Sequence, residues 1–94
     1  MIVLQIEHRV PNYDGWKKAF ESDPLERKKS GVKSYRVYRP VNDLGYVIID
    51  LLFEQETDAD KMLAALHKLW GNVEGTVMMN PQTRILKIEE EKRY

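Results

Sequence analysis

The chain has no cysteine, so it contains neither a disulfide framework nor a thiolate metal site. It also lacks an excess of charge of either sign: 15 basic residues balance 15 acidic ones, which argues against nucleic-acid binding. No apolar run is long enough for a membrane span, and the first residues turn polar too early for a signal peptide. We therefore expect a single domain over residues 1–94, in the cytoplasm, with no nucleic-acid or membrane partner.

Four segments are expected to be strands: residues 2–10, 32–40, 46–54 and 82–89. Segments 2–10, 32–40 and 82–89 alternate between apolar and polar residues, as half-buried strands do, whereas 46–54 is almost continuously apolar. The turn-forming residues of 40–45 predict a hairpin between the middle two strands. The stretch 71–81 reads as a loop.

The first helix is marked by an aromatic stripe on one face, Tyr13, Trp16 and Phe20, after an N-cap at Asn12. Asp23 followed by Pro24 is typical of a helix start, so a second, short helix is expected there. Gly31 is placed to end it in a left-handed conformation.

A longer helix is expected from a cap at Thr57 to a stop at Gly71. Its apolar stripe comprises Ala59, Met62, Leu63, Leu66, Leu69 and Trp70. The main elements then follow the order βαββαβ. With right-handed crossovers this order gives a ferredoxin-like α+β fold, in which both helices cover one face of a four-stranded antiparallel sheet.

The hairpin also predicts which side chains share a face. A three-residue turn within 42–45 pairs positions whose numbers add to an even value. The face away from the helices then carries Arg36, Tyr38, Tyr46, Ile48, Asp50 and Leu52. Strand 2–10 should add Val3, Gln5, Glu7 and Arg9, because its other side is nearly all aliphatic. A face this mixed suits neither bulk water nor a dry core, so a second copy of the chain is expected to cover it.

The segment from His8 to Phe20 resembles the opening of small dimeric α+β barrel proteins related to the antibiotic-biosynthesis monooxygenase superfamily. Further similarity lies in Gly31-Val32 before the run 35–39, and in the glycine-containing loop that ends at Pro81. The resemblance implies two sheets packed face to face across a twofold axis, forming a homodimeric barrel. It also implies cofactor-independent oxygenation, or a related cyclase or isomerase reaction, if the protein is an enzyme.

Asp50 is the sharpest candidate, because it interrupts the most apolar strand of the chain. With Arg36 or Tyr38 it could orient a ligand or act as a general base. The alternative is a cross-strand ion pair or hydrogen bond that closes the dimer. The catalytic candidates are Asp50, Glu7 and His67. The pocket-lining candidates are Gln5, Arg9, Arg36, Tyr38, Tyr46, Ile48, Leu52 and Trp70.

The two histidines, His8 and His67, are weaker candidates for a functional site than Asp50. His8 is expected to be a hydrogen-bonded histidine at the edge of the core. His67 stands one helical turn from Trp70, and haem-degrading relatives use a helix histidine as iron ligand, so haem is an alternative cofactor. Otherwise no cofactor and no metal is expected. Met78 and Met79 are read as core or as a lid.

The function predicted from the sequence is binding of a small hydrophobic or aromatic molecule between sheet and helices of a homodimer. Catalysis like that of the antibiotic-biosynthesis monooxygenases (ABM) is left open. A non-catalytic ligand-binding or structural dimer and a haem-binding protein are the alternatives.

Overall fold

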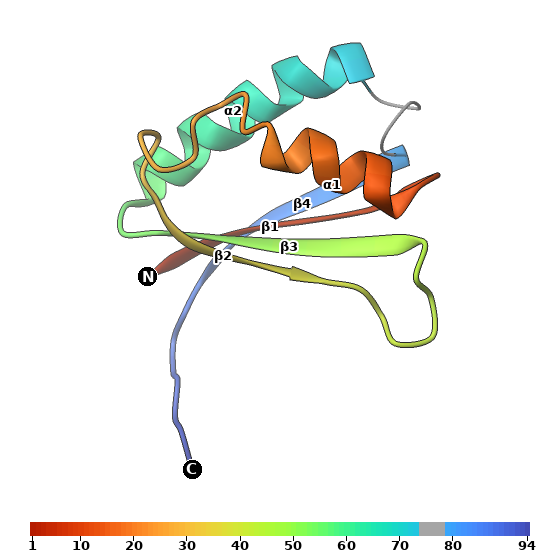
Figure 1. The fold of residues 1–94 in the computed structure, drawn as a ribbon. Coiled ribbons are helices and arrows are strands. Elements are labelled where there is room, and N and C mark those ends of the chain that lie inside the picture. The colour runs from red at the N-terminus through yellow and green to blue at the C-terminus, as the bar shows by residue number, and fades with distance from the viewer. Residues whose placement is uncertain (74–78) are drawn as a thin grey trace.

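A computed structural model describes residues 1–73 and 79–94 of the chain. It contains one antiparallel four-stranded sheet with two helices on one of its faces (Figure 1). The elements are β1 (Ile2–Arg9), α1 (Tyr13–Glu21), β2 (Val32–Tyr38), β3 (Tyr46–Phe53), α2 (Glu56–Val73) and β4 (Met79–Lys87). The strands lie in the order β2-β3-β1-β4, so the predicted ferredoxin-like βαββαβ arrangement is confirmed.

The register of the hairpin is the predicted one. Arg36 pairs with Asp50 and Tyr38 with Ile48, so the paired numbers add to an even value. Strand β1 continues the pattern on the other side of β3, where Gln5 lies opposite Asp50. The strongly apolar β3 therefore turns its odd-numbered side chains toward the helices and its even-numbered ones to the opposite face.

The core fills the space between sheet and helices. Its most buried side chains from the sheet are Leu4, Val47, Ile49, Leu51 and Phe53, and from the helices Trp16, Ala59, Met62 and Trp70. Helix α1 packs its aromatic stripe against this core. The helix starts after Asn12, whose side-chain oxygen accepts a hydrogen bond from the Gly15 amide at 3.2 Å. The predicted stripe is a continuous stack, with Trp16 and Phe20 ring centroids 5.1 Å apart.

The prediction of a short helix after Asp23 is wrong. Residues 22–31 form successive turns instead. Asp23 and Glu26 adopt left-handed φ angles of 51° and 49°, which interrupt any helical run. The capping character of Asp23 is nevertheless real, because its carboxylate accepts from the Arg27 amide at 2.9 Å. Gly31 has the expected positive φ, 101°.

Several boundaries also differ from expectation. Helix α2 begins at Glu56, one residue before Thr57, and the Gln55 carbonyl accepts the first helical bonds. Gly71 does not end α2, which runs to Val73; a glycine without a positive φ continues a helix at only modest cost. Strand β4 starts at Met79 and includes Pro81, which an edge strand tolerates.

Met79 lies on β4 and is exposed, so it is neither core nor loop. Met78 lies outside the described residues. The last residues, 88–94, leave the domain on the side of the sheet away from the helices (Figure 1). No helix within residues 1–73 and 79–94 has the length and apolar character needed to cross a membrane.

Candidate functional site

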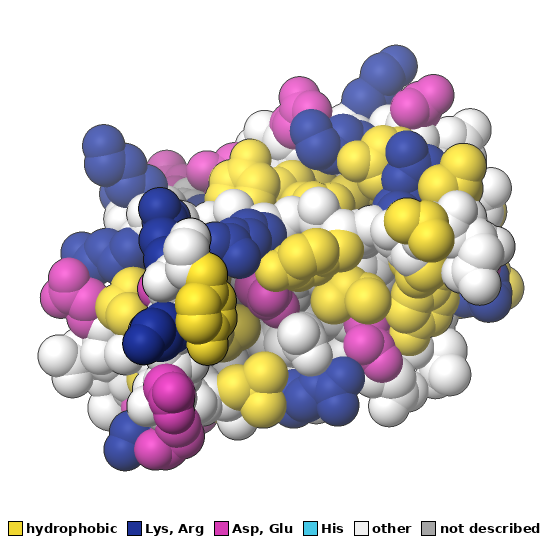
Figure 2. Space-filling view, turned by 90° about the horizontal axis from the view of Figure 1, so that it is seen from below, with side chains coloured by type: hydrophobic (Ala, Val, Ile, Leu, Met, Phe, Trp, Pro, Cys, Tyr) yellow, Lys and Arg dark blue, Asp and Glu magenta, His cyan; other side chains and the backbone are white. Residues whose placement is uncertain are grey.

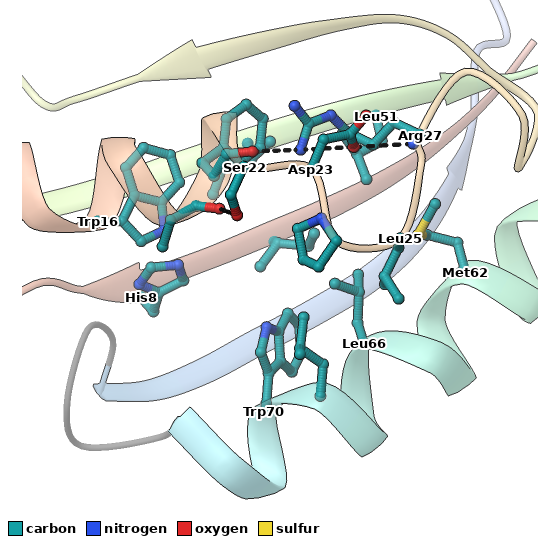
Figure 3. A pocket seen from close by; sticks show the side chains of 16 residues that line it. His8, Trp16, Ser22, Asp23, Leu25, Arg27, Leu51, Met62, Leu66 and Trp70 are labelled. Carbon is teal, nitrogen blue, oxygen red and sulfur yellow. Dashed lines mark hydrogen bonds and ion pairs between the residues drawn. The ribbon is translucent and has the colours of Figure 1, made fainter.

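A cavity of about 290 Å³ lies between the sheet and the two helices (Figure 3). We call it the helix–sheet cavity. Its lining residues are Ile6, His8, Trp16, Ala19, Phe20, Ser22, Asp23, Pro24, Leu25, Arg27, Ile49, Leu51, Met62, Leu66, Leu69 and Trp70. Most are apolar and several are aromatic, which is the usual character of a small-molecule site.

Each wall of the cavity follows from a feature of the sequence. The odd face of β3 supplies Ile49 and Leu51, and the aliphatic face of β1 supplies Ile6. The amphipathic faces of the two helices supply the aromatic and methionine side chains opposite. The turns of 22–31 contribute the remaining lining residues, Ser22, Asp23, Pro24, Leu25 and Arg27.

His8 is the deeply buried polar side chain of this cavity. It is 1% exposed and packs against the edge of Trp16, with ring centroids 5.9 Å apart. Burial lowers its pKa below the usual 6.5, and the nearby Arg9 carbonyl only partly opposes this shift. The imidazole is therefore neutral at pH 7. Its Nδ1 atom lies 3.1 Å from the Arg9 carbonyl oxygen, which makes it the hydrogen-bonded edge histidine that the sequence predicted.

The opposite rim of the cavity carries a charged pair. The Arg27 guanidinium donates to the Phe20 carbonyl at 2.9 Å and lies 3.9 Å above the Phe20 ring centroid. The Asp23 carboxylate is 3.4 Å from the same guanidinium. These contacts fasten the turns of 22–31 to the end of α1, and thereby hold one wall of the cavity in place.

Apart from His67 and Trp70 on α2, the sequence-predicted site residues lie elsewhere, on the sheet face away from the helices. We call this surface the open face. Hydrophobic side chains alternate there with lysine, arginine, aspartate and glutamate (Figure 2). Val3, Ile48 and Leu52 are buried or half-buried, although this face has no layer above it.

Asp50 is the centre of a hydrogen-bonded row on the open face. It accepts from the Tyr38 hydroxyl at 2.8 Å and from the Gln5 amide at 2.9 Å. The Gln5 oxygen in turn accepts from Arg84 Nε at 2.8 Å, and Arg84 forms an ion pair with Glu7 at 3.2 Å. The row crosses all four strands, so its members fix one another's orientation.

The remaining predicted residues flank this row. Arg36 is opposite Asp50 in register, but the ion pairs found among the described residues do not join them. Arg9 pairs instead with Asp43 at 2.7 Å and lies 5.5 Å from the Tyr46 ring centroid. Burial raises the pKa of the Tyr46 hydroxyl, and the Glu7 carboxylate adds to that shift.

Trp70 is the predicted pocket residue that lines the helix–sheet cavity. His67 is exposed on α2 and is not part of that lining, although its ring lies 5.7 Å from that of Trp70. An iron ligand from His67 would thus lie outside the cavity, and the described residues do not fit haem held there by His67. Within the described part of the chain, no cluster of histidine and acidic residues could hold a metal ion.

Sequence reasoning missed Arg84 and the contribution of 22–31. Arg84 could have been found from alternation, since it stands two residues from Gln82 and Leu86 on the polar side of the last strand. The contribution of residues 22–31 to the cavity lining had no comparable signal in the sequence. The path of these residues depends on two left-handed residues that are not glycine.

Comparison with known proteins bears on the fold. The chain matches no protein-family model and no curated protein sequence. Among solved structures, SnoaB, a cofactor-independent oxygenase from Streptomyces nogalater, superposes with a TM-score of 0.76 at 7% identity, covering 96% of this chain and 94% of that one. An antibiotic biosynthesis monooxygenase gives 0.69 at 8% identity, over 96% and 100%.

The chain has the fold of the antibiotic biosynthesis monooxygenases (the ABM fold). A variant of MhuD, crystallised with two manganese protoporphyrin IX molecules bound per active site, shares this fold with a TM-score of 0.74 at 14% identity, covering both chains completely. At such identities the likeness extends to the fold alone, and chemistry has to be argued from this chain's own side chains.

Proposed function

We propose that the protein binds a small apolar or aromatic molecule in the helix–sheet cavity, as a homodimer joined through the open face. The observation that carries the proposal is the cavity itself, which is lined mostly by apolar side chains and holds a buried neutral imidazole. The open face supports the dimer, since half-buried aliphatic side chains there alternate with a hydrogen-bonded polar row.

The binding test uses indole as a two-ring aromatic probe. Leu66 lines the cavity and Ala64 is exposed on the same helix, so a tryptophan at each position makes a matched pair. We expect titration calorimetry to show binding to the natural protein, loss of binding in Leu66→Trp and unchanged binding in Ala64→Trp. Binding that survives in Leu66→Trp would place the ligand elsewhere.

The second candidate function is oxygenation without a cofactor, in line with an ABM-like enzyme. It is favoured by an unprotonated histidine in an apolar site, which can accept a proton from a weakly acidic carbon. For a CH2 group beside a carbonyl or aromatic ring, His8 would take one proton, and the carbanion would add O2 and recover the proton as a hydroperoxide. Loss of water then gives the ketone, so R2CH2 + O2 yields R2CO + H2O.

Oxygen uptake with 2-indanone, a two-ring ketone whose CH2 groups lie between an aromatic ring and a carbonyl, tests this second candidate. We expect uptake above the rate without protein, lost in His8→Phe and retained in Asp50→Asn and Glu7→Gln. The reverse pattern, with loss in the two acidic variants, would assign the base to the open face, where the sequence placed it. No uptake by the natural protein would leave a non-catalytic binding dimer as the function.

Haem binding is the third candidate function, and the exposed position of His67 argues against it. We expect that added haemin produces no visible absorbance band that depends on His67. A band present in the natural protein and absent in His67→Ala would restore this reading.

A further inference from the structure

Residues 88–94 extend from the end of β4 away from the domain, and we call them the C-terminal arm. The Ile88 amide donates to the Met1 carbonyl at 3.1 Å, which fixes the start of the arm to the sheet. Residues 89–94 beyond it are all exposed, and they run out on the side of the open face (Figure 1). An extended segment keeps one path only where contacts compensate the conformational entropy that it loses. The position of the arm therefore points to a partner for it below the open face.

The arm starts at the end of the sheet where β2 also starts. Lys87, the last residue of β4, lies opposite Ile2 of β1. Phe53 of β3 lies opposite both Ile2 and Val32. These residues form one row across the sheet, with the arm at one edge of the row and the first residue of β2 at the other.

The arm and strand β2 carry opposite charges near this row. The acidic run Glu89-Glu90-Glu91 comes first in the arm, and Lys92 and Arg93 lie beyond it. Strand β2 carries Lys33 and Arg36, and both are exposed. Because β2 is at the edge of the sheet, one row of its backbone N–H and C=O groups also faces outward. This edge thus suits an extended acidic segment.

A second copy of the chain brings the two together. Two sheets packed face to face lie about 10 Å apart. At roughly 3.3 Å per residue, the arm reaches about 23 Å, so it can cross to a second sheet and continue along it. A twofold axis that lies between the sheets and parallel to their strands places β4 of each chain opposite β2 of the other.

We propose that the C-terminal arm of each protomer lies along the β2 edge of its partner, with the glutamates of 89–91 beside Lys33 and Arg36 of the partner subunit. This inference rests on the proposed homodimer and adds an exchanged arm to its interface. Twofold symmetry makes the contact twice in each dimer.

Cross-linking between isotopically distinct copies tests the exchange. Unlabelled and nitrogen-15-labelled natural protein are mixed, left to exchange subunits, and treated with a carbodiimide, which joins a carboxylate to an amine in contact with it. We expect mass spectrometry to find Lys33 joined to the glutamates of 89–91 in pairs of one labelled and one unlabelled peptide. Lys87 and Glu89, 3.8 Å apart in one chain, are the internal control and should be joined within one isotope only.

Two results would overturn the inference. One is a Lys33 cross-link to the arm found only within a single isotope, which would place the arm on its own chain. The other is the absence of this cross-link in a sample where the Lys87–Glu89 control has formed.

Exchanging the charges gives an independent measurement. We expect Glu90→Lys to weaken dimerisation in sedimentation about two- to fivefold, within the range of an exposed ion pair, and Lys33→Glu added to it to restore the affinity. Asp60→Lys, at an exposed acid of α2 on the far side of the sheet, should leave the affinity unchanged. An affinity unchanged in Glu90→Lys, or lowered equally in Asp60→Lys, would contradict the proposed contact.

The arm and the dimer fail in different ways. A natural protein that sediments as a dimer but gives no mixed-isotope link at Lys33 refutes the exchanged arm and leaves the interface through the open face intact. A natural protein that sediments as a monomer refutes the homodimer itself, and the exchanged arm with it.

Discussion

The buried His8 makes a quantitative prediction about how stability depends on pH. It is 1% exposed, and burial holds its folded-state pKa below the value of 6.5 expected in the unfolded chain. Between these two pKa values the unfolded chain binds more protons than the folded one. Stability is therefore constant above pH 6.5 with respect to this group and falls as the pH drops from 6.5 to the folded pKa.

The size of the effect follows from the number of protons. A single histidine gives a limiting slope of about 1.4 kcal/mol per pH unit in the free energy of unfolding. Such a slope is a substantial part of the roughly 5–15 kcal/mol that stabilises a typical domain. The charged groups that share the cavity with His8 are Asp23 and Arg27.

Urea unfolding between pH 7.5 and 5 measures this slope, with Trp16 and Trp70 as fluorescent reporters of the core. The natural protein and His67→Gln should lose stability together below pH 6.5, at a fixed protein concentration. The variant His8→Gln should show a markedly flatter profile there. If all three proteins follow the same profile, His8 is not the buried neutral group described above.

Three further results are expected. Gly31→Ala should destabilise the fold by about 1–3 kcal/mol, since φ is 101° and an added Cβ would lie 2.9 Å from the Asp58 carboxylate. Gly71→Ala, in open space on a helix, should instead stabilise it by up to about 1 kcal/mol; a loss at Gly71 equal to that at Gly31 would contradict this. Ile48→Lys on the open face should turn a dimer into a monomer in sedimentation at micromolar concentration, whereas Val41→Lys on the 99% exposed hairpin turn should not. A dimer that persists in Ile48→Lys would exclude the open face as the interface.

Much of the fold could be predicted because its signals are local. The even pairing expected from a three-residue hairpin turn, and the wholly apolar or aromatic set that this pairing places on one face, were enough to pair Arg36 with Asp50 and to separate the two faces of the sheet. Boundaries failed where tertiary context prevailed over local preference. Pro81 lies within β4 because that strand is at the edge of the sheet, and Gly71 lies within α2 because nothing there requires a turn.

The candidate site was harder to predict, since it depends on how distant segments meet. Asp50, an acid in an apolar strand, led to the prediction of a site on the open face. There its carboxylate accepts hydrogen bonds from Tyr38 and Gln5. The helix–sheet cavity instead owes its shape to the turns of 22–31, whose path rests on left-handed Asp23 and Glu26. The burial of His8 was foreseeable, because it shares the aliphatic face of β1 with Ile6.

The central claim is that a ligand occupies the helix–sheet cavity rather than the open face. Neighbouring isoleucines of β3 report on the two locations, since Ile49 lines the cavity and Ile48 lies on the open face. Methyl NMR spectra recorded during an indole titration distinguish them directly. We expect the methyl signals of Ile49 and Ile6 to shift while those of Ile48 stay in place; shifts confined to Ile48 and Leu52 would contradict the account.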